Sequence, residues 1–304
     1  MTTTRTLLSL SAALAALAAT GPAAAYNLFT YGDNQALKWG SNTLGTPGGI
    51  VTWSLMADGT TLDPSTAGLG MSGSSSLSGV FAQVGGEAAA LAAIQASFDA
   101  WSVVAGIQFV HVSESGSLPF GAPYAAQNSG APVVGSIRIG AFAIDGYVGA
   151  VGYAPPPNGA TTLEGDVVFN ASNRFGIPAG GEGDLYELYP ASNGYYYLND
   201  FAGLFTHELG HALGLAHTDV PGAVMCGYVN GSFTGSQCAW ADPDGDFMAP
   251  ITRRPKADDI AGIQALYGAA PVPEPSVWAL WAAGLVGLVL RRPRARYQGI
   301  SGIS

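Results

Sequence analysis

Residues 207–217 constrain the fold of this chain more than any other stretch, because they read HELGHALGLAH. On a helix, His207 and His211 lie four residues apart and share one face, which lets both imidazoles reach the same ion. Glu208 follows the first histidine and can approach a water on that ion without ligating the ion itself. The stretch therefore predicts a helix that carries two metal ligands and a carboxylate.

A sharp turn is expected directly after this helix. Gly214 tolerates a positive φ, which ends a helix, and the turn brings His217 round as a third ligand. Three protein ligands leave the fourth position of a tetrahedral zinc ion open for water, as in catalytic sites. Glu208 is then placed to take a proton from that water and return it to the amine of a cleaved peptide bond. Only four histidines occur in the 304 residues, and three belong to this motif, so an ordinary core helix is a poor alternative.

The longer stretch HELGHALGLAHTDVPGAVM, residues 207–225, resembles the active-site helix and Met-turn of the metzincins, and among them the matrixin (matrix-metalloproteinase-like) group. The resemblance implies a zinc endopeptidase in which Met225 forms an apolar floor beneath the metal. Residues 258–268, DDIAGIQALYG, resemble the matrixin C-terminal helix. There the resemblance implies that Asp258 or Asp259 accepts hydrogen bonds from the Met-turn backbone, in a structural role.

The hydrophobic pattern predicts one α+β domain over residues 26–270. The resemblance covers residues 37–268 and implies a metzincin-like fold, with a twisted, mostly parallel sheet, an antiparallel edge strand, three helices and a Met-turn after the active-site helix. The Gly- and Ser-rich residues 57–86 are expected to form a long loop. Strands are expected at residues 38–39, 50–56, 107–112, 136–142, 148–154 and 166–170, and helices at residues 87–104, 199–216 and 256–267.

The chain departs from the matrixin pattern at a second metal site. Matrixins carry a structural zinc on histidines near the edge strand, where this sequence has Val151 and Val168. The one histidine outside the motif is His111, which is more simply a strand residue with a satisfied partner than a ligand. A single catalytic zinc is therefore expected.

The two cysteines, Cys226 and Cys238, both follow the active-site helix. They do not match the matrixin cysteine switch, which is an upstream thiol that caps the zinc. In an exported chain the two are expected to form one disulfide beside the Met-turn. The segment 226–256 is longer than in matrixins and is expected to line the pocket for the substrate side chain after the cut.

Calcium is the other metal that the resemblance raises. Asp145 and Asp166 fall near positions where matrixins bind structural calcium, and residues 242–246, DPDGD, cluster three carboxylates. That cluster lacks the glycine and the terminal glutamate of an EF-hand loop. Solvated acidic turns are the simpler account of these residues.

The first 25 residues are typical of a secretory signal peptide. Arg5 supplies the positive region, residues 7–19 the apolar stretch, and the three alanines at 23–25 a small-residue cleavage site. We therefore expect export and a mature domain that begins near residue 26.

Residues 271–304 carry a second targeting pattern. Residues 273–275 read Pro-Glu-Pro, the apolar run 276–290 follows, and then come Arg291, Arg292, Arg294 and Arg296. A helical run of 15 residues reaches roughly 22 Å, short of a hydrocarbon core of about 30 Å. The order resembles the PEP-CTERM sorting tail of Gram-negative bacteria, which implies a transient inner-membrane contact and cleavage by an exosortase-like enzyme. The alternative is a permanent anchor with its arginines on the cytoplasmic side.

Charge and motif together define the expected partners. Residues 26–270 carry six basic and 20 acidic side chains, a net charge near −14, which argues against a nucleic-acid partner. A peptide substrate is expected to lie along residues 148–154 as an added strand.

The rival hypothesis is a surface or biofilm-matrix protein that uses a metzincin scaffold for binding only. Glu208 favours the enzyme, because a scaffold has no need of a water-activating carboxylate.

Overall fold

The computed structural model describes residues 25–32, 35–115, 118–122, 134–146, 148–156, 163–188, 198–227, 238, 240–241, 247–271, 281 and 286. The chain divides into two units, Met1–Ala270 and Pro271–Ser304, and all the elements below belong to the first. The expected signal segment up to residue 24, nearly all of the expected sorting tail and the acidic cluster at 242–246 lie outside the described residues.

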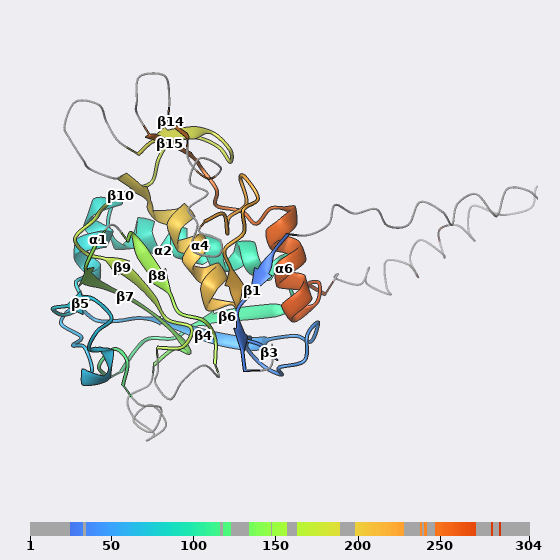
Figure 1. Ribbon diagram of the computed structural model, residues 1–304, viewed down its shortest axis with the longest axis horizontal. Coiled ribbons are helices and arrows are strands. Elements are labelled where there is room, and N and C mark those ends of the chain that lie inside the picture. Colours follow the sequence, from blue (N-terminus) through green and yellow to red (C-terminus); the bar gives the residue numbers. More distant parts are fainter. Residues whose placement is uncertain are drawn as a thin grey trace, which may run out of the picture. The chain divides into compact units, whose positions relative to one another are not determined.

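A mostly parallel sheet forms the centre of the first unit, with strand order β6-β4-β7-β9-β8 (Figure 1). The strands β4, β6, β7 and β9 pair in parallel, whereas the edge strand β8 and the short β5 are antiparallel to their neighbours. Their bounds are β4 Gly49–Leu55, β5 Met71–Ser72, β6 Ile107–His111, β7 Ile137–Ile144, β8 Ala150–Gly152 and β9 Val167–Asn170. This arrangement confirms the predicted fold class, including the antiparallel edge strand.

Two long helices pack on one another and against this sheet, and a third lies close to the end of the active-site segment (Figure 1). They are α2 Glu87–Ser102, α4 Phe201–Ala212 and α6 Ala257–Tyr267. All three are predicted by the sequence, although α4 ends four residues earlier than the expected 216. In the described part of the chain no single helix has the length and apolar character to cross a membrane, whereas α1 (Leu77–Gln83) and α2, bent by 93° at their junction, pass that test as a pair.

Two predictions of local structure are wrong. The helix α1, Leu77–Gln83, lies in the segment assigned to a loop and makes a fourth helix where three are expected. Its Leu77, Val80 and Phe81 are buried, so tertiary packing stabilises a helix whose Ser and Gly neighbours conceal it. Residues 38–39 form no strand, because the buried Lys38 Nζ donates to the carbonyl of Trp39 and to other oxygens of the loop that follows.

Core packing holds the helix α4 against α2 and against the sheet. The ring of Phe98 on α2 lies 4.8 Å from that of Trp53 on β4 and 5.6 Å from that of Phe205 on α4. Trp101 Nε1 donates to the carbonyl of Thr206 at 3.0 Å. Because these groups are fully buried, α4 has little freedom to shift.

Short strands complete the unit around the active-site helix. The pairs are β1 with β13, β2 with β3 and β10 with β12, and a three-stranded sheet has the order β11-β15-β14. Their bounds are β1 Asn27–Leu28, β2 Thr30–Tyr31, β3 Gln35–Ala36, β10 Arg174–Gly176, β11 Leu185–Glu187, β12 Leu198–Asp200, β13 Leu215–Ala216, β14 Trp240–Ala241 and β15 Phe247–Pro250, and a 3-10 turn η1 spans Pro64–Thr66. The three-stranded sheet joins segments from before and after α4.

Candidate metal centre and active site

A glycine turn brings the third histidine beside the first two. The helix α4 ends at Ala212, and Gly214 follows with a φ of 104°. A Cβ at this position would lie 2.2 Å from the carbonyl oxygen of Leu37, so only glycine fits both the backbone conformation and the space. The turn confirms the predicted end of the helix and leads the chain to His217.

The three histidines converge as the motif predicts. His217 Nε2 lies 3.1 Å from Nε2 of His207 and 3.1 Å from Nε2 of His211. These spacings are close to the roughly 3.3 Å between ligand atoms on a tetrahedral zinc ion with Zn–N bonds of about 2.0 Å. Within the described ranges this is the one group of three or more histidine, cysteine or acidic side chains arranged to hold a metal.

The hydrogen bonds of the rings show that this group suits a cation. His207 Nδ1 lies 2.6 Å from the carbonyl oxygen of Val224, and His211 Nδ1 lies 2.8 Å from that of Leu215. A carbonyl only accepts, so each Nδ1 carries the proton and each Nε2 presents a lone pair. The lone pairs of His207 and His211 both point at Nε2 of His217, which can supply at most one proton. A zinc ion at the centre satisfies all three nitrogens.

Burial keeps the imidazoles of His207 and His211 neutral, which is the form that binds zinc. Burial, reinforced by the neighbouring His217, lowers the pKa of His207 to about 4. Burial, followed by the neighbouring His207 and His217, places the pKa of His211 well below its ordinary value.

Protonation of His207 is expected to lower the free energy of unfolding of the metal-free protein as the pH falls from 6.5 to about 4. In this window the unfolded chain protonates His207 near the ordinary pKa of 6.5, whereas the folded chain protonates it only near about 4. The unfolded state therefore binds more protons, so the free energy of unfolding rises with pH and falls as the pH is lowered. Thermal melts in chelator at successive pH values measure this, and a variant with His207→Asn and His211→Asn should show a weaker slope. An equal slope in both proteins would contradict the assignment.

Glu208 lies beside the triad and is almost completely buried, with 7% of its surface exposed. Its Oε2 accepts a hydrogen bond of 2.7 Å from the backbone N–H of Gly152 on the edge strand β8. Burial raises the pKa of Glu208 to about 8, and the Gly152 N–H opposes that shift. A carboxyl with a raised pKa in a cleft is suited to exchanging protons near neutral pH.

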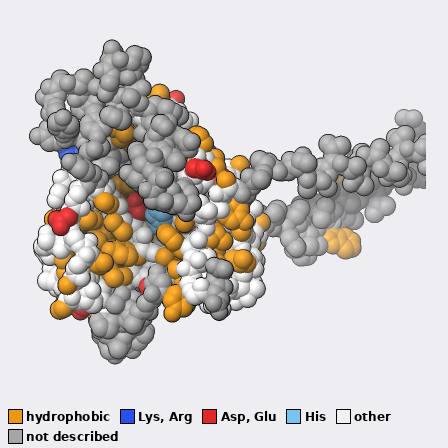
Figure 2. Space-filling view, viewed as in Figure 1, with side chains coloured by type: hydrophobic (Ala, Val, Ile, Leu, Met, Phe, Trp, Pro, Cys, Tyr) orange, Lys and Arg blue, Asp and Glu red, His pale blue; other side chains and the backbone are white. Residues whose placement is uncertain are grey.

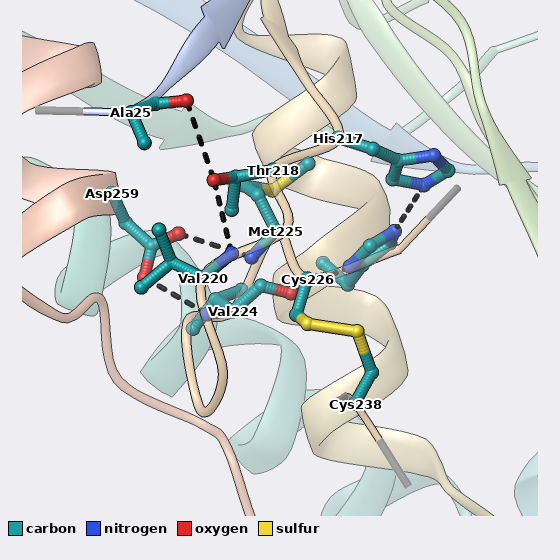
Figure 3. The surroundings of a disulfide bond; sticks show 10 residues. Ala25, His217, Thr218, Val220, Val224, Met225, Cys226, Cys238 and Asp259 are labelled. Atoms are coloured by element: carbon teal, nitrogen blue, oxygen red, sulfur yellow. Dashed lines mark hydrogen bonds between the residues drawn. A yellow bond between two sulfur atoms is a disulfide. The ribbon is translucent and has the colours of Figure 1, made fainter. Parts of the chain in front are cut away.

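The Met-turn follows the third ligand as predicted. Met225 is 2% exposed, and its Sδ would lie 2.3 Å from a Cβ placed at Gly210 on the active-site helix. Asp259 accepts hydrogen bonds from the backbone N–H groups of Val224 and Met225 at 2.8 and 3.0 Å (Figure 3). Of the two aspartates considered, Asp259 therefore binds the Met-turn. Asp258 instead accepts a hydrogen bond of 2.8 Å from the N–H of Ala25.

Cys226 and Cys238 form the predicted disulfide (Figure 3). Cys226 directly follows Met225, so the bridge ties the Met-turn to a residue twelve positions further along the chain. Gly227 comes next, and a Cβ there would lie 2.6 Å from the ring of His217. The disulfide is therefore part of the frame around the third ligand.

Two cavities meet at the site. One, of about 260 Å³, is lined by His207, Glu208, both disulfide cysteines and residues of β11 and β15. The other, of about 410 Å³, is lined by Phe29, all three residues of β8, His211 and His217, and again by Glu208. Among the described residues Glu208 is the one that lines both, so a chain that fills the two cavities passes directly over it. Figure 2 shows histidine and acidic side chains together on this face, with apolar side chains on either side.

Apolar packing occupies the positions of the second matrixin zinc. Val151 on β8 lies directly opposite Val168 on β9. Val168 is fully buried in a cluster with Met56 and Phe142, and Val151 packs against that cluster. His111, on the far edge of the sheet, stacks on Trp53 with ring centroids 4.1 Å apart.

We expect one tightly held zinc per chain, because two opposed valines offer no ligand where a structural zinc would lie. Elemental analysis after dialysis against a weak chelator measures the count. Strong chelators should remove the metal while the far-ultraviolet circular dichroism spectrum is kept, since the sheet is held by its core. Two zinc ions per chain would contradict this prediction.

The two aspartates considered for calcium lie at opposite ends of β7. Asp145 follows the strand and is exposed, whereas Asp166 is fully buried and accepts a hydrogen bond of 2.7 Å from the N–H of Arg138 near its start. Seven strand residues span about 23 Å, so the two carboxylates cannot share one ion. Burial places the pKa of Asp166 well above its ordinary value. Calcium binding at Asp145 and calcium binding at Asp166 are therefore two separate predictions.

The contacts of several residues that shape the site are not predicted by the sequence. Trp39 Nε1 donates to the carbonyl of Ala212 at 2.9 Å, and Tyr267 Oη donates to that of Leu213 at 2.7 Å. Both contacts cap the C-terminal end of α4, and only the tertiary structure brings them there. The role of Gly152 is also missing from the prediction made from the sequence. Its place in the edge strand is predicted, but its contact with Glu208 is not.

Comparison with known proteins finds similarity to metalloproteinases. A family model described as Matrixin matches residues 82–268, more than half of the chain. Macrophage metalloelastase of Rattus norvegicus is 41% identical over 71 residues, 23% of this chain and 12% of that protein. Matrilysin of Rattus norvegicus is 44% identical over 69 residues, 23% of this chain and 20% of that protein. Metalloendoproteinase 5-MMP of Arabidopsis thaliana is 30% identical over 129 residues, 42% of this chain and 28% of that protein.

The chain thus matches less than a third of the length of each of these relatives. The family match itself spans both long helices, the active-site motif, the Met-turn and α6. The sequence motif, the histidine triad and the family match agree on one conclusion: this chain belongs to the Matrixin family, a family of zinc metalloproteases.

Proposed function

We propose that this protein is a zinc-dependent endopeptidase that works outside the cytoplasm. The observation that carries the proposal is the position of Glu208. Its buried carboxylate lies beside three converging histidines, at the junction of two cavities. A group that exchanges protons is thus placed where a bound chain would cross the metal centre.

The residues have distinct roles in this reaction. His207, His211 and His217 would hold zinc, which when bound lowers the pKa of a water molecule and polarises the peptide carbonyl. Glu208 removes a proton from the attacking water and returns it to the leaving amine. The apolar surroundings keep bulk water away from the carboxylate and strengthen its interactions.

The edge strand β8 offers a place for the peptide backbone. In the described part of the chain β8 pairs with no strand other than β9, so its other edge faces the 410 Å³ cavity, with the Gly152 N–H on Glu208 and the Ala150 N–H directed outward. An extended peptide can add there as a strand. The side chain after the cut would then enter the 260 Å³ cavity between the disulfide and the strands β11 and β15. This position supports the expectation that the long segment 226–256 shapes specificity.

Cleavage of denatured casein by the purified mature domain tests the proposal. We expect activity with zinc, loss of activity with a chelator, and recovery when zinc is returned. A zinc-loaded domain that cleaves neither casein nor a mixed peptide library would reject the endopeptidase and leave the binding scaffold as the account. The carboxylate of Glu208 favours the endopeptidase over the binding scaffold, because only the enzyme needs a group that transfers protons.

Export and processing form the second part of the proposal. The signal-like residues 1–25 would direct the chain across the inner membrane, and the tail would hold it there until an exosortase-like enzyme cuts near residues 273–275. The domain left at residues 26–270 is strongly acidic, which suits a soluble protein in the periplasm or beyond the cell.

Mature protein from the native host is expected to lack residues 1–25 and the segment from about residue 276 onward. A run of 15 apolar residues spans a bilayer only with strain, which favours a transient hold. Intact-mass analysis measures both ends. Protein that retains the four arginines would favour the permanent anchor instead. A recombinant host without the sorting enzyme should keep the tail and hold the protein in its membrane.

A further inference from the structure

We infer that the backbone N–H of Gly152 positions Glu208 for proton transfer. The inference rests on the proposed function and assigns different roles to two residues of the edge strand β8. Gly152 would hold the carboxylate, and Ala150 would provide the backbone groups that bind the substrate. Gly152 is thus a positioning residue, because it acts through Glu208 and not on the substrate.

The contact itself has the features of a strong hydrogen bond. The Gly152 N lies 2.7 Å from Glu208 Oε2, which is at the short end of the range for N–H···O hydrogen bonds. Glu208 is 7% exposed, so little water competes for this oxygen. One carboxylate oxygen is thereby fixed, and the side chain is held in a single orientation with its other oxygen available.

The pairing of β8 shows that this N–H lies on the open edge of the sheet. Tyr153 N donates to the carbonyl of Asp166, and Asn170 N donates to that of Gly149. Backbone groups of an antiparallel strand alternate between its two edges. Positions 149, 151 and 153 therefore face β9, and the N–H and C=O groups of Ala150 and Gly152 face the cavity.

A peptide that adds to this edge would meet two outward N–H groups. Glu208 already engages the one on Gly152, and the one on Ala150 remains for the substrate. The strand thus aligns the peptide and the base on the same edge, two residues apart, or about 7 Å along the strand. Any shift of the strand would move both together, which keeps the base in register with the bond to be cut.

Glycine at position 152 allows this close approach of strand and helix. A Cβ there would lie 2.1 Å from the carbonyl oxygen of Glu208 and 3.0 Å from Cβ of His211. A larger residue would push β8 away from α4 and lengthen the contact. The Gly152→Ala variant would therefore disturb the packing of the strand as well as the hydrogen bond, so it is a poor test.

A main-chain ester removes the hydrogen bond without adding a side chain. Gly152→glycolate, introduced by nonsense suppression in the full chain, replaces the N–H by an oxygen. We expect kcat for a peptide substrate to fall about 10- to 100-fold, the scale of a small misplacement of a catalytic group. KM and the zinc dissociation constant should stay within a factor of about two, because the histidines and Ala150 are unchanged.

The matched control is Ala150→lactate, which removes the other outward N–H. It should raise KM, because this group is assigned to the substrate and does not contact Glu208. If Gly152→glycolate instead raises KM and leaves kcat unchanged, Gly152 binds substrate and the inference is wrong. Unchanged kcat and KM would also overturn it.

A measurement that needs no catalysis separates this inference from the proposed function. In zinc-loaded, nitrogen-15-labelled protein, the Gly152 amide proton should resonate far downfield and move upfield in Glu208→Ala. No such shift would overturn the contact even in an active enzyme. If the parent protein itself cleaves nothing, the proposed function fails and the catalytic role of Gly152 fails with it, whereas the amide shift still reports whether the contact exists.

Discussion

Glu208→Ala is expected to keep its zinc and lose nearly all peptidase activity. The residues arranged to hold a metal are the three histidines, so the metal should bind as in the parent protein. The variant lacks the only carboxylate that lines both cavities among the described residues. Loss of a general base costs about 10²- to 10⁴-fold in rate. Zinc content by elemental analysis and kcat/KM on one peptide give the two readings.

Glu208→Gln provides the control for shape. It preserves the side-chain volume and an oxygen that can accept from Gly152, but it cannot take a proton. We expect an equally large loss of activity, with a melting temperature closer to the parent than that of Glu208→Ala. Substantial turnover by either zinc-loaded variant would reject the proposed proton transfer.

Local patterns in the sequence predict most of this fold and nearly all of the metal centre. The spacing of His207, His211 and His217 fixes the ligands because helix geometry and one glycine turn suffice to bring them together. Five strands of the central sheet are apolar enough to be located to within two residues, whereas the short β5 lies in a segment expected to be a loop. The choice between Asp258 and Asp259 needs the structure, since adjacent residues on a helix point in different directions.

The contacts that the sequence does not predict are those that long-range packing decides. Trp39 reaches Ala212 across 173 positions, and nothing near Trp39 marks it as a helix cap. The helix α1 is stabilised by burial and not by its own residues. The pairing of β11 with β15 joins segments on either side of the active-site helix. The strands β11 and β15 line the 260 Å³ cavity, which is why the motif predicts the chemistry better than the substrate.

Asp259→Ala is expected to lower the free energy of unfolding by roughly 3 kcal/mol or more, because it leaves three backbone donors without their acceptor. Those donors are the N–H groups of Val224, Met225 and Lys256, at 2.8, 3.0 and 2.8 Å. Asp259 is 1% exposed, so water cannot readily replace it. A loss of that size corresponds to a fall of about 6–12 °C in melting temperature for a domain of this length.

The same substitution should weaken zinc binding, and this separates a role in the Met-turn from a general loss of stability. The carbonyl of Val224 holds Nδ1 of His207, so a displaced Met-turn releases one ligand. Partners of this kind contribute about 10- to 100-fold to metal affinity. Asp258→Asn is the matched control on the neighbouring residue, since the Val224 and Met225 N–H groups donate to Asp259, and it should leave the zinc affinity unchanged. If Asp259→Ala lowers the melting temperature but binds zinc as tightly as the parent, Asp259 stabilises the helix α6 and not the metal centre.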